Sequence, residues 1–297
     1  MIGWVAATLI AAAAQTARNA TQASLTRAIG TIGATQVRFL FGLPFALVFL
    51  ALIAGFDGPV PPLTAEALGF TCIGALSQIA ATALMLHTMK SQSFAVTTAW
   101  IKTEPVLVAL IAAAVLGDPL TLPMLLAIAV ATAGVILMSL KPGASAAMWR
   151  DGGPALTGIC AGALFGLSAI GFRGAIVALP EGDFLIRATT ILALGLALQA
   201  TLLFAWLALF DRPALAASVK AWRPSLGAGF LGAFASQFWF IGFSLTSAAN
   251  VRTVALVEVI FALAIARIVF GQKLTARQML GMAVLVLGVA LLLLSPA

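Results

Sequence analysis

The chain has 297 residues, of which 62% are hydrophobic and only 8% are charged, and its formal net charge is +7. Because soluble domains carry about 25% charged residues, this composition excludes a water-soluble globular protein. Most Lys and Arg residues interrupt apolar runs, which is typical of membrane-protein loops and cavity charges rather than of a nucleic-acid-binding surface. The two cysteines, Cys72 and Cys160, lie inside apolar runs, and we expect small packing residues there.

The apolar runs are continuous and rich in Ala and Leu, which predicts helices because a backbone in lipid must form its hydrogen bonds internally. Each crossing needs about 20 residues. We therefore predict an all-α membrane protein. Charged, Pro- and Gly-containing breaks divide it into ten transmembrane helices, at residues 2–24, 31–55, 66–88, 94–116, 122–141, 154–178, 184–209, 225–247, 250–270 and 276–295. The first lacks the basic segment of a secretory signal, so we expect it to be retained.

The two halves of the chain repeat a set of residues at a constant offset of 154 positions. Glu104, Gly117, Leu120, Thr121 and Gly134 recur as Glu258, Gly271, Leu274, Thr275 and Gly288. We predict two five-helix repeats, 1–141 and 154–297, joined by a linker at 142–153. Since five crossings reverse the direction of entry, the second repeat would be inverted relative to the first, as in many secondary transporters.

The distribution of basic residues predicts an orientation for these crossings. Loops after odd-numbered spans contain nine Lys and Arg residues, and those after even-numbered spans contain three. The positive-inside rule places the first set in the cytoplasm. Both the N- and C-termini would then lie on the periplasmic side.

The duplicated pattern is E-P-V…G-D-P-L-T…G-V-I-L in the first half and E-V-I…G-Q-K-L-T…G-V-A-L in the second. It resembles the drug/metabolite transporter superfamily of EamA type. Size, aromatic residues and amide residues are most similar to the YddG-type aromatic amino-acid exporters of bacterial inner membranes. The resemblance implies a basket of helices around a central cavity, with spans one to four of each repeat lining it. A departure is the first span, which lacks the carboxylate that small multidrug relatives use for proton coupling.

Four polar residues of the first span share one helical face at spacings i, i+3, i+4 and i+7, namely Gln15, Arg18, Asn19 and Gln22. Unpaired polar groups in lipid cost several kcal/mol each, so this face should avoid lipid. It is either the wall of a wet cavity or a set of hydrogen bonds between helices near the end of the span.

Spans three and eight carry a matching polar pair, Ser77–Gln78 and Ser236–Gln237, at an offset of 159, and Trp239 follows the second. Two amides at matching depth suggest two sides of one binding site. The alternative is that they join helices by hydrogen bonds.

Span four places Thr97, Trp100 and Glu104 on one face. Trp100 could offer its indole to a ring-bearing substrate, or it could be an interfacial anchor. Phe165 and Ser168 form a similar face in span six, where phenylalanines are more often core residues. The glycines of span six at positions 158, 162 and 166 predict close packing of another helix.

Glu104 and Glu258 stand at the head of apolar runs, where a carboxylate needs a reason. Pro105 follows Glu104 and removes a backbone donor, which kinks or opens the helix. The carboxylates could bind a substrate ammonium or act as gate residues. The alternative is a structural role, in which each bonds to freed backbone groups or to a base such as Lys102 or Arg252.

The function predicted from these features is that of a secondary transporter. No phosphate-binding loop or catalytic constellation is present, so we expect no ATP-driven pump, no enzyme, no cofactor and no metal. We predict export of amino acids, aromatic ones favoured, by alternating access, with a carboxylate-bearing small molecule and membrane lipid as partners. The two fused repeats should allow one chain to work alone. Alternatives are a sugar-phosphate, nucleotide-sugar or general drug/metabolite carrier and, distantly, an intramembrane enzyme.

Overall fold

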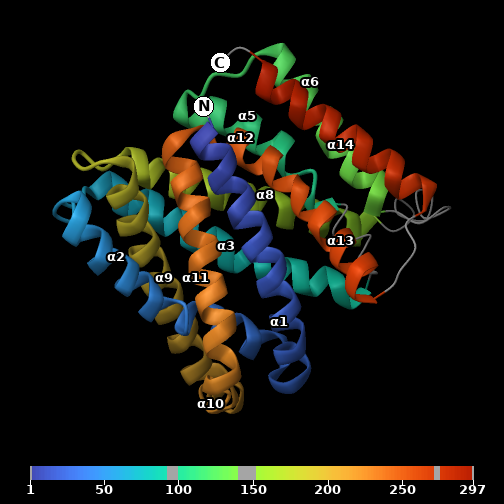
Figure 1. Cartoon of the computed structure of the whole chain (residues 1–297). Coiled ribbons are helices and arrows are strands. Elements are labelled where there is room, and N and C mark those ends of the chain that lie inside the picture. Colours follow the sequence, from blue (N-terminus) through green and yellow to red (C-terminus); the bar gives the residue numbers. More distant parts are fainter. Residues whose placement is uncertain (1, 92–99, 140–151, 271–274, 296–297) are drawn as a thin grey trace. The chain divides into compact units, whose positions relative to one another are not determined.

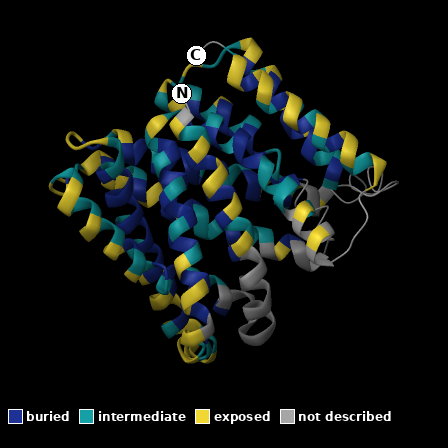
Figure 2. Ribbon diagram, viewed as in Figure 1, coloured by how far each residue is buried: buried dark blue, intermediate teal, exposed yellow. Residues whose placement is uncertain are grey.

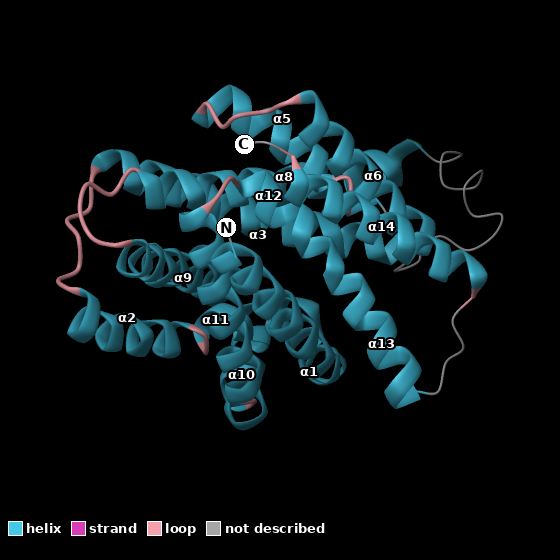
Figure 3. Cartoon of the chain, turned by 45° about the horizontal axis from the view of Figure 1, so that its top comes forward, coloured by secondary structure: helices cyan, strands magenta, loops and turns pink. Residues whose placement is uncertain are grey.

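The computed structural model describes residues 2–91, 100–139, 152–270 and 275–295, without the side chains of 19–32 and of scattered other helical positions. Over these ranges the chain is helical and contains no strand (Figure 3), so the predicted all-α class is confirmed. Within them, seven helices are long and apolar enough to cross a membrane, and an eighth apolar helix, Glu104–Leu116, is shorter. The number of ten crossings stays a prediction.

The described helices follow the predicted spans closely at six of ten positions (Figure 1). The first half contains α1 (Ile2–Leu40), α2 (Leu43–Asp57), α3 (Ala65–Ser91), α5 (Glu104–Leu116) and α6 (Leu122–Ser139). The second half contains α8 (Gly152–Val177), α9 (Phe184–Phe210), α10 (Arg212–Lys220), α11 (Trp222–Leu245), α12 (Ala248–Val254), a 3-10 turn (Ala255–Val257), α13 (Glu258–Phe270) and α14 (Ala276–Leu294). The predicted linker lies outside the described residues up to position 151.

The expected break between the first two spans is wrong as placed, because α1 is helical from Ile2 to Leu40. The helix is nevertheless not straight. Side-chain atoms of Arg18 and Arg38 lie 3.6 Å and 3.7 Å from the point that a Cβ on Gly232 would occupy. Twenty residues of straight helix would separate the two by about 30 Å. The chain therefore turns back on itself between them, without losing its helical backbone.

The fourth and ninth spans, predicted as continuous, are each interrupted in front of a glutamate. In the fourth span the helix stops after Ile101, and α5 begins at Glu104 with Pro105 in its first turn. A proline is tolerated there because the first N–H groups of a helix have no intrahelical acceptor. In the ninth span, α12 gives way to the 3-10 turn, and α13 begins at Glu258. Residues 94–99 of the fourth span lie outside the described part.

The chain divides into two compact units, and each takes helices from both halves of the sequence. The first unit contains Met1–Leu76 and Gly171–Thr246, and the second contains Ser77–Ile170 and Ser247–Ala297. The helices α3 and α8 each contribute one segment to either unit. The repeats 1–141 and 154–297 are units of sequence, and their inverted arrangement stays a prediction.

In the second unit, α6 and α14 lie side by side in both views (Figures 1 and 3). Their contact depends on glycine, since a Cβ on Gly281 would lie 2.8 Å from the carbonyl oxygen of Gly134. Gly288 approaches the backbone of Ala131 as closely. The buried residues of α14 recur every three or four positions, and its other face is exposed (Figure 2). Such a helix buries one stripe and offers the other to lipid.

In the first unit, α1 packs antiparallel to α11, with Gly3 near Leu245 and Gln15 bonded to Trp239. The start of α3 packs on the end of α8 through glycines: a Cβ on Gly171 would lie 2.6 Å from the amide nitrogen of Gly74. Backbones approach this closely only where neither helix has a side chain at the contact.

The duplicated G-x-x-L-T motif has a structural explanation at helix ends. Gly117 ends α5 with a φ of 66°, in the left-handed region that favours glycine, and its amide bonds back into the helix. Thr121 Oγ1 accepts a hydrogen bond from Met124 N at the start of α6. Thr275 caps α14 in a capping box with Gln278. The motif thus stops one helix and starts the next, and Gly271 lies outside the described residues.

Candidate functional site

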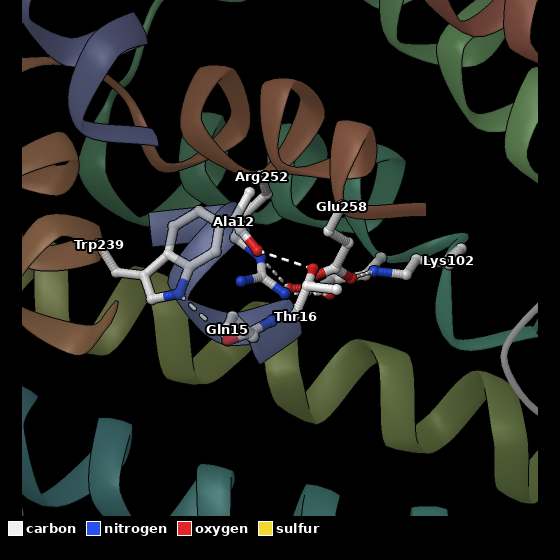
Figure 4. Close-up of polar contacts among 8 residues, drawn as sticks. Ala12, Gln15, Thr16, Lys102, Trp239, Arg252 and Glu258 are labelled. Atoms are coloured by element: carbon white, nitrogen blue, oxygen red, sulfur yellow. Dashed lines mark hydrogen bonds and ion pairs between the residues drawn. The ribbon is translucent and has the colours of Figure 1, made fainter. Parts of the chain in front are cut away.

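Two ion pairs connect the interrupted spans of the second unit. Arg252 Nη2 donates to Glu104 Oε2 at 2.7 Å, and its Nε lies 2.6 Å from Oε1 of the same carboxylate. Lys102 Nζ donates to Glu258 Oε1 (Figure 4). Each half of the sequence therefore contributes one acid and one base, and both carboxylates pair with a base from the opposite half.

The helix interruptions place these charges. Lys102 lies in the break of the fourth span, and Glu104 and Glu258 are the first residues of α5 and α13. A carboxylate in the first turn is favoured by the positive end of the helix dipole. Glu104 is buried, with Gly166 of α8 against its side chain at 3.7 Å.

The arrangement supports the structural interpretation of both carboxylates, and its two bases are those that the sequence suggested. The exposed fractions of the side chains are 3% for Glu104, 18% for Arg252, 12% for Lys102 and 15% for Glu258. Charges this deeply buried persist only when paired, since an unpaired one costs several kcal/mol. A gating role stays a prediction.

A second polar set lies in the first unit, on the facing surfaces of α1, α9 and α11. The indole N–H of Trp239 donates to Gln15 Oε1 at 3.1 Å (Figure 4). Gln237 Nε2 donates to Thr189 Oγ1 of α9 at 2.7 Å. Its own Oε1 is buried, with no hydrogen-bond partner among the described residues. Three of the residues singled out in the sequence thus lie on this surface.

An aromatic series accompanies this polar set along α11. Phe230, Phe234 and Phe238 are spaced by four residues, with ring centroids 5.8 Å and 4.9 Å apart. On another face, Phe240 contacts Phe172 of α8, with 4.8 Å between ring centroids. This helix therefore combines two buried amide or indole groups with a largely aromatic surround.

The remaining predicted site residues are less informative. Ser77, Ser168 and Ser236 are buried, while Gln78 and Phe165 are partly buried. The side chains of Asn19 and Gln22, and all of Thr97, lie outside the described residues. None of these residues gains or loses a substrate-binding role from its position.

Trp100 packs as the predicted glycine ridge suggests. It is 1% exposed, and a Cβ on Gly158 would lie 2.7 Å from its Cε3. Gly162 meets Ile101, and Gly166 meets Val108. Close packing of another helix on this ridge is confirmed, and the buried ring favours packing over interfacial anchoring. A substrate-binding role for Trp100 stays a prediction.

Sequence reasoning missed Thr189 and the meeting of Arg18 with Arg38. Thr189 and Thr190 are a polar pair within an otherwise apolar span, which was a usable signal. The packing role expected for Cys72 and Cys160 is wrong, because both are exposed. No group of three His, Cys, Asp or Glu residues in the described part could hold a metal ion.

Comparison with known proteins identifies the family. The model of the EamA-like transporter family matches residues 2–140 and again residues 154–294. The chain belongs to the EamA-like transporter family. This EamA-like protein is also similar to a solved structure described only as the crystal structure of a protein. The TM-score is 0.69, the identity is 16%, and 96% of either chain is covered. That likeness concerns the fold, and no curated protein matches the chain.

Family membership establishes the broad class of activity. EamA-like proteins are membrane transporters of the drug/metabolite superfamily and not enzymes. The chain is accordingly a multi-pass membrane protein whose partners are a small-molecule substrate and membrane lipid.

Proposed function

We propose that this EamA-like protein is a secondary transporter that exports amino acids, aromatic ones favoured, across the bacterial inner membrane. The observation that carries the proposal is the surface of α11, where Gln237 and Trp239 lie beside aromatic side chains. Small-molecule sites are mostly apolar and aromatic, with a few placed polar groups. The buried and unpartnered Oε1 of Gln237 supplies an acceptor for a substrate N–H.

The mechanism we propose is alternating access by two inverted five-helix repeats with ten crossings and periplasmic termini. In this mechanism Gln15, Gln237 and Trp239 contact the substrate. The ion pairs of Glu104 and Glu258 keep their carboxylates paired in every conformation, as their burial supports. A single chain is the transporting unit. Reporter fusions at the C-terminus and within Arg212–Lys220 test the topology, and a cytoplasmic C-terminus would contradict it.

The substrate is tested with purified protein reconstituted into proteoliposomes. Labelled tryptophan, phenylalanine and threonine are presented, with unlabelled substrate inside to drive counterflow. We expect saturable flux of the two aromatic amino acids and slower flux of threonine. Absence of flux for all three, together with phosphate-driven counterflow of a sugar phosphate, would replace the proposal with the sugar-phosphate alternative.

A matched pair of variants links the flux to the proposed surface. Trp239→Ala should abolish most of the aromatic flux, because it removes a buried ring and its N–H donor. Trp222→Ala, on the same helix but 48% exposed, should leave the flux unchanged. Equal losses in the two variants would count against substrate contact at Trp239.

A further inference from the structure

Two arginines of the first unit meet at a single residue of α11. Arg18 and Arg38 are twenty positions apart, but the return of α1 brings both to Gly232. A Cβ on Gly232 would lie 3.6 Å from Arg18 Cδ and 3.7 Å from Arg38 Cγ. The stems of two guanidinium-bearing side chains thus share a position at which α11 has no side chain.

This meeting point lies within the apolar part of α11. The candidate span begins at Ser225, and Gly232 is seven residues further on, so it lies about 10 Å from that end at 1.5 Å per residue. An arginine near a helix end can extend to the interface, but Arg18 is 6% exposed and remains inside. Ionisable groups at such depth face interior paths and mark sites for ions or substrates.

The carboxylates of the first unit are placed elsewhere. Asp57, Asp183 and Asp211 accept hydrogen bonds from backbone amides at the ends of helices. Glu66 and Glu181 are exposed. The unit therefore carries positive charge into its helices, while all five of its acidic residues stand at helix ends or in loops.

We propose that Arg18 and Arg38 form an anion-binding subsite at Gly232 that holds the carboxylate of the transported metabolite. This deepens the proposed function and rests on it. Guanidinium groups bind carboxylates and phosphates through pairs of parallel hydrogen bonds. Arg38 is steadied by the ring of Phe39, whose centroid lies 5.2 Å from Cζ.

The position of the subsite suits an aromatic amino acid. Trp239 follows Gly232 by seven residues, which is two helical turns, so both face α1 about 10 Å apart along α11. A ligand whose carboxylate lies at Gly232 can thus extend its ring toward Trp239 and Gln15. The arginines would select the charged end of the ligand, and the aromatic surface would select its ring.

The test compares ligands that differ in one group. Full-length protein in lipid nanodiscs is assayed for binding of labelled L-phenylalanine, with competition by unlabelled phenylalanine, by phenethylamine, which lacks the carboxylate, and by inorganic phosphate. For the wild type we expect phenethylamine to need at least about a tenfold higher concentration than phenylalanine, as expected for loss of a charge-assisted hydrogen bond.

The variants locate that preference. Arg38→Gln and Gly232→Leu should bring the two ligands to within about twofold, since one removes a guanidinium and the other fills its space. The controls are Arg223→Gln, an exposed arginine of the same helix, and Gly227→Leu, whose Cβ position is open. Both controls should keep the tenfold difference. Arg18→Gln is informative only if the protein folds, so the other two variants decide.

The outcomes separate the subsite from the transport function. The subsite is overturned if wild-type protein binds both ligands equally, or if Arg38→Gln and Gly232→Leu keep the preference while flux persists. If phenylalanine is neither bound nor transported, but phosphate raises the unfolding temperature of the wild type and not of Arg38→Gln, the subsite stands and the amino-acid function falls. If neither anion is bound, both proposals fail.

Discussion

Arg252 binds the carboxylate of Glu104 through two of its nitrogens, at 2.6 Å and 2.7 Å, and so joins α12 to α5. The two residues are 148 positions apart and belong to different halves of the sequence. A bidentate arginine–carboxylate pair fixes orientation as well as distance. Together with Lys102 and Glu258, it makes the interrupted spans depend on each other.

Removing Arg252 should destabilise the protein strongly. Arg252→Ala leaves Glu104 buried without its base, and the expected loss is about 3–5 kcal/mol of unfolding free energy. Thermal unfolding in detergent, followed by size-exclusion of the surviving monodisperse protein, measures it. The combined change Arg252→Leu with Glu104→Leu should recover most of the loss, because no lone charge remains. A double variant as unstable as Arg252→Ala would show that the charge is not the cause.

The two ion pairs should not be energetically independent. Lys102 and Glu104 are two residues apart at one helix start, so a change at one pair shifts its neighbour. We expect Glu258→Gln and Glu104→Gln combined to depart from the sum of the single effects by about 0.5–3 kcal/mol. A double-mutant cycle on unfolding free energies measures this coupling. Strict additivity would mean that the pairs act separately.

The contact of α6 with α14 should tolerate no side chain at its glycines. Gly288→Leu places atoms against the backbone of Ala131, and we expect a loss of about 1–3 kcal/mol or more. The matched control is Gly69→Ala in α3, where nothing lies within 4 Å of the new Cβ. That change should be neutral or raise stability by up to about 1 kcal/mol, from improved helix propensity. Similar losses for both variants would contradict the packing assigned to Gly288.

The Trp239–Gln15 hydrogen bond should contribute a modest amount. Trp239→Phe keeps an aromatic ring but removes the donor, so we expect a loss of about 0.5–1.5 kcal/mol. Adding Gln15→Leu should cost less than it does in the wild type, since the acceptor no longer has a partner to lose. Thermal unfolding of the four proteins gives the coupling. If Gln15→Leu has the same effect in both backgrounds, the two side chains do not interact.

Much of the helical plan was predictable because lipid imposes it. Long apolar runs and their Pro- and Gly-containing breaks placed α3, α6, α8, α9, α11 and α14 to within three residues. The break before Glu104 had a local signal in Pro105. The break before Glu258 had none, since Val259 is an ordinary helix residue.

The candidate site was predictable in composition but not in its pairing. Residue spacing identified Gln15, Gln237 and Trp239, but only the packing of α1 on α11 shows which atoms bond. The return of α1 was unpredictable in form, because the backbone stays helical through it. The arginine pair at Gly232 depends on that return, which no local pattern encodes.

The way the compact units draw on the chain has a consequence for biosynthesis. The first unit cannot be completed until residues up to Thr246 have left the ribosome, and the second needs segments that reach the C-terminal end. The early helices must therefore wait in the bilayer with bare glycine faces and unneutralised charges. Insertion and folding are separate events for this protein, and whatever shields those helices during the delay governs its yield.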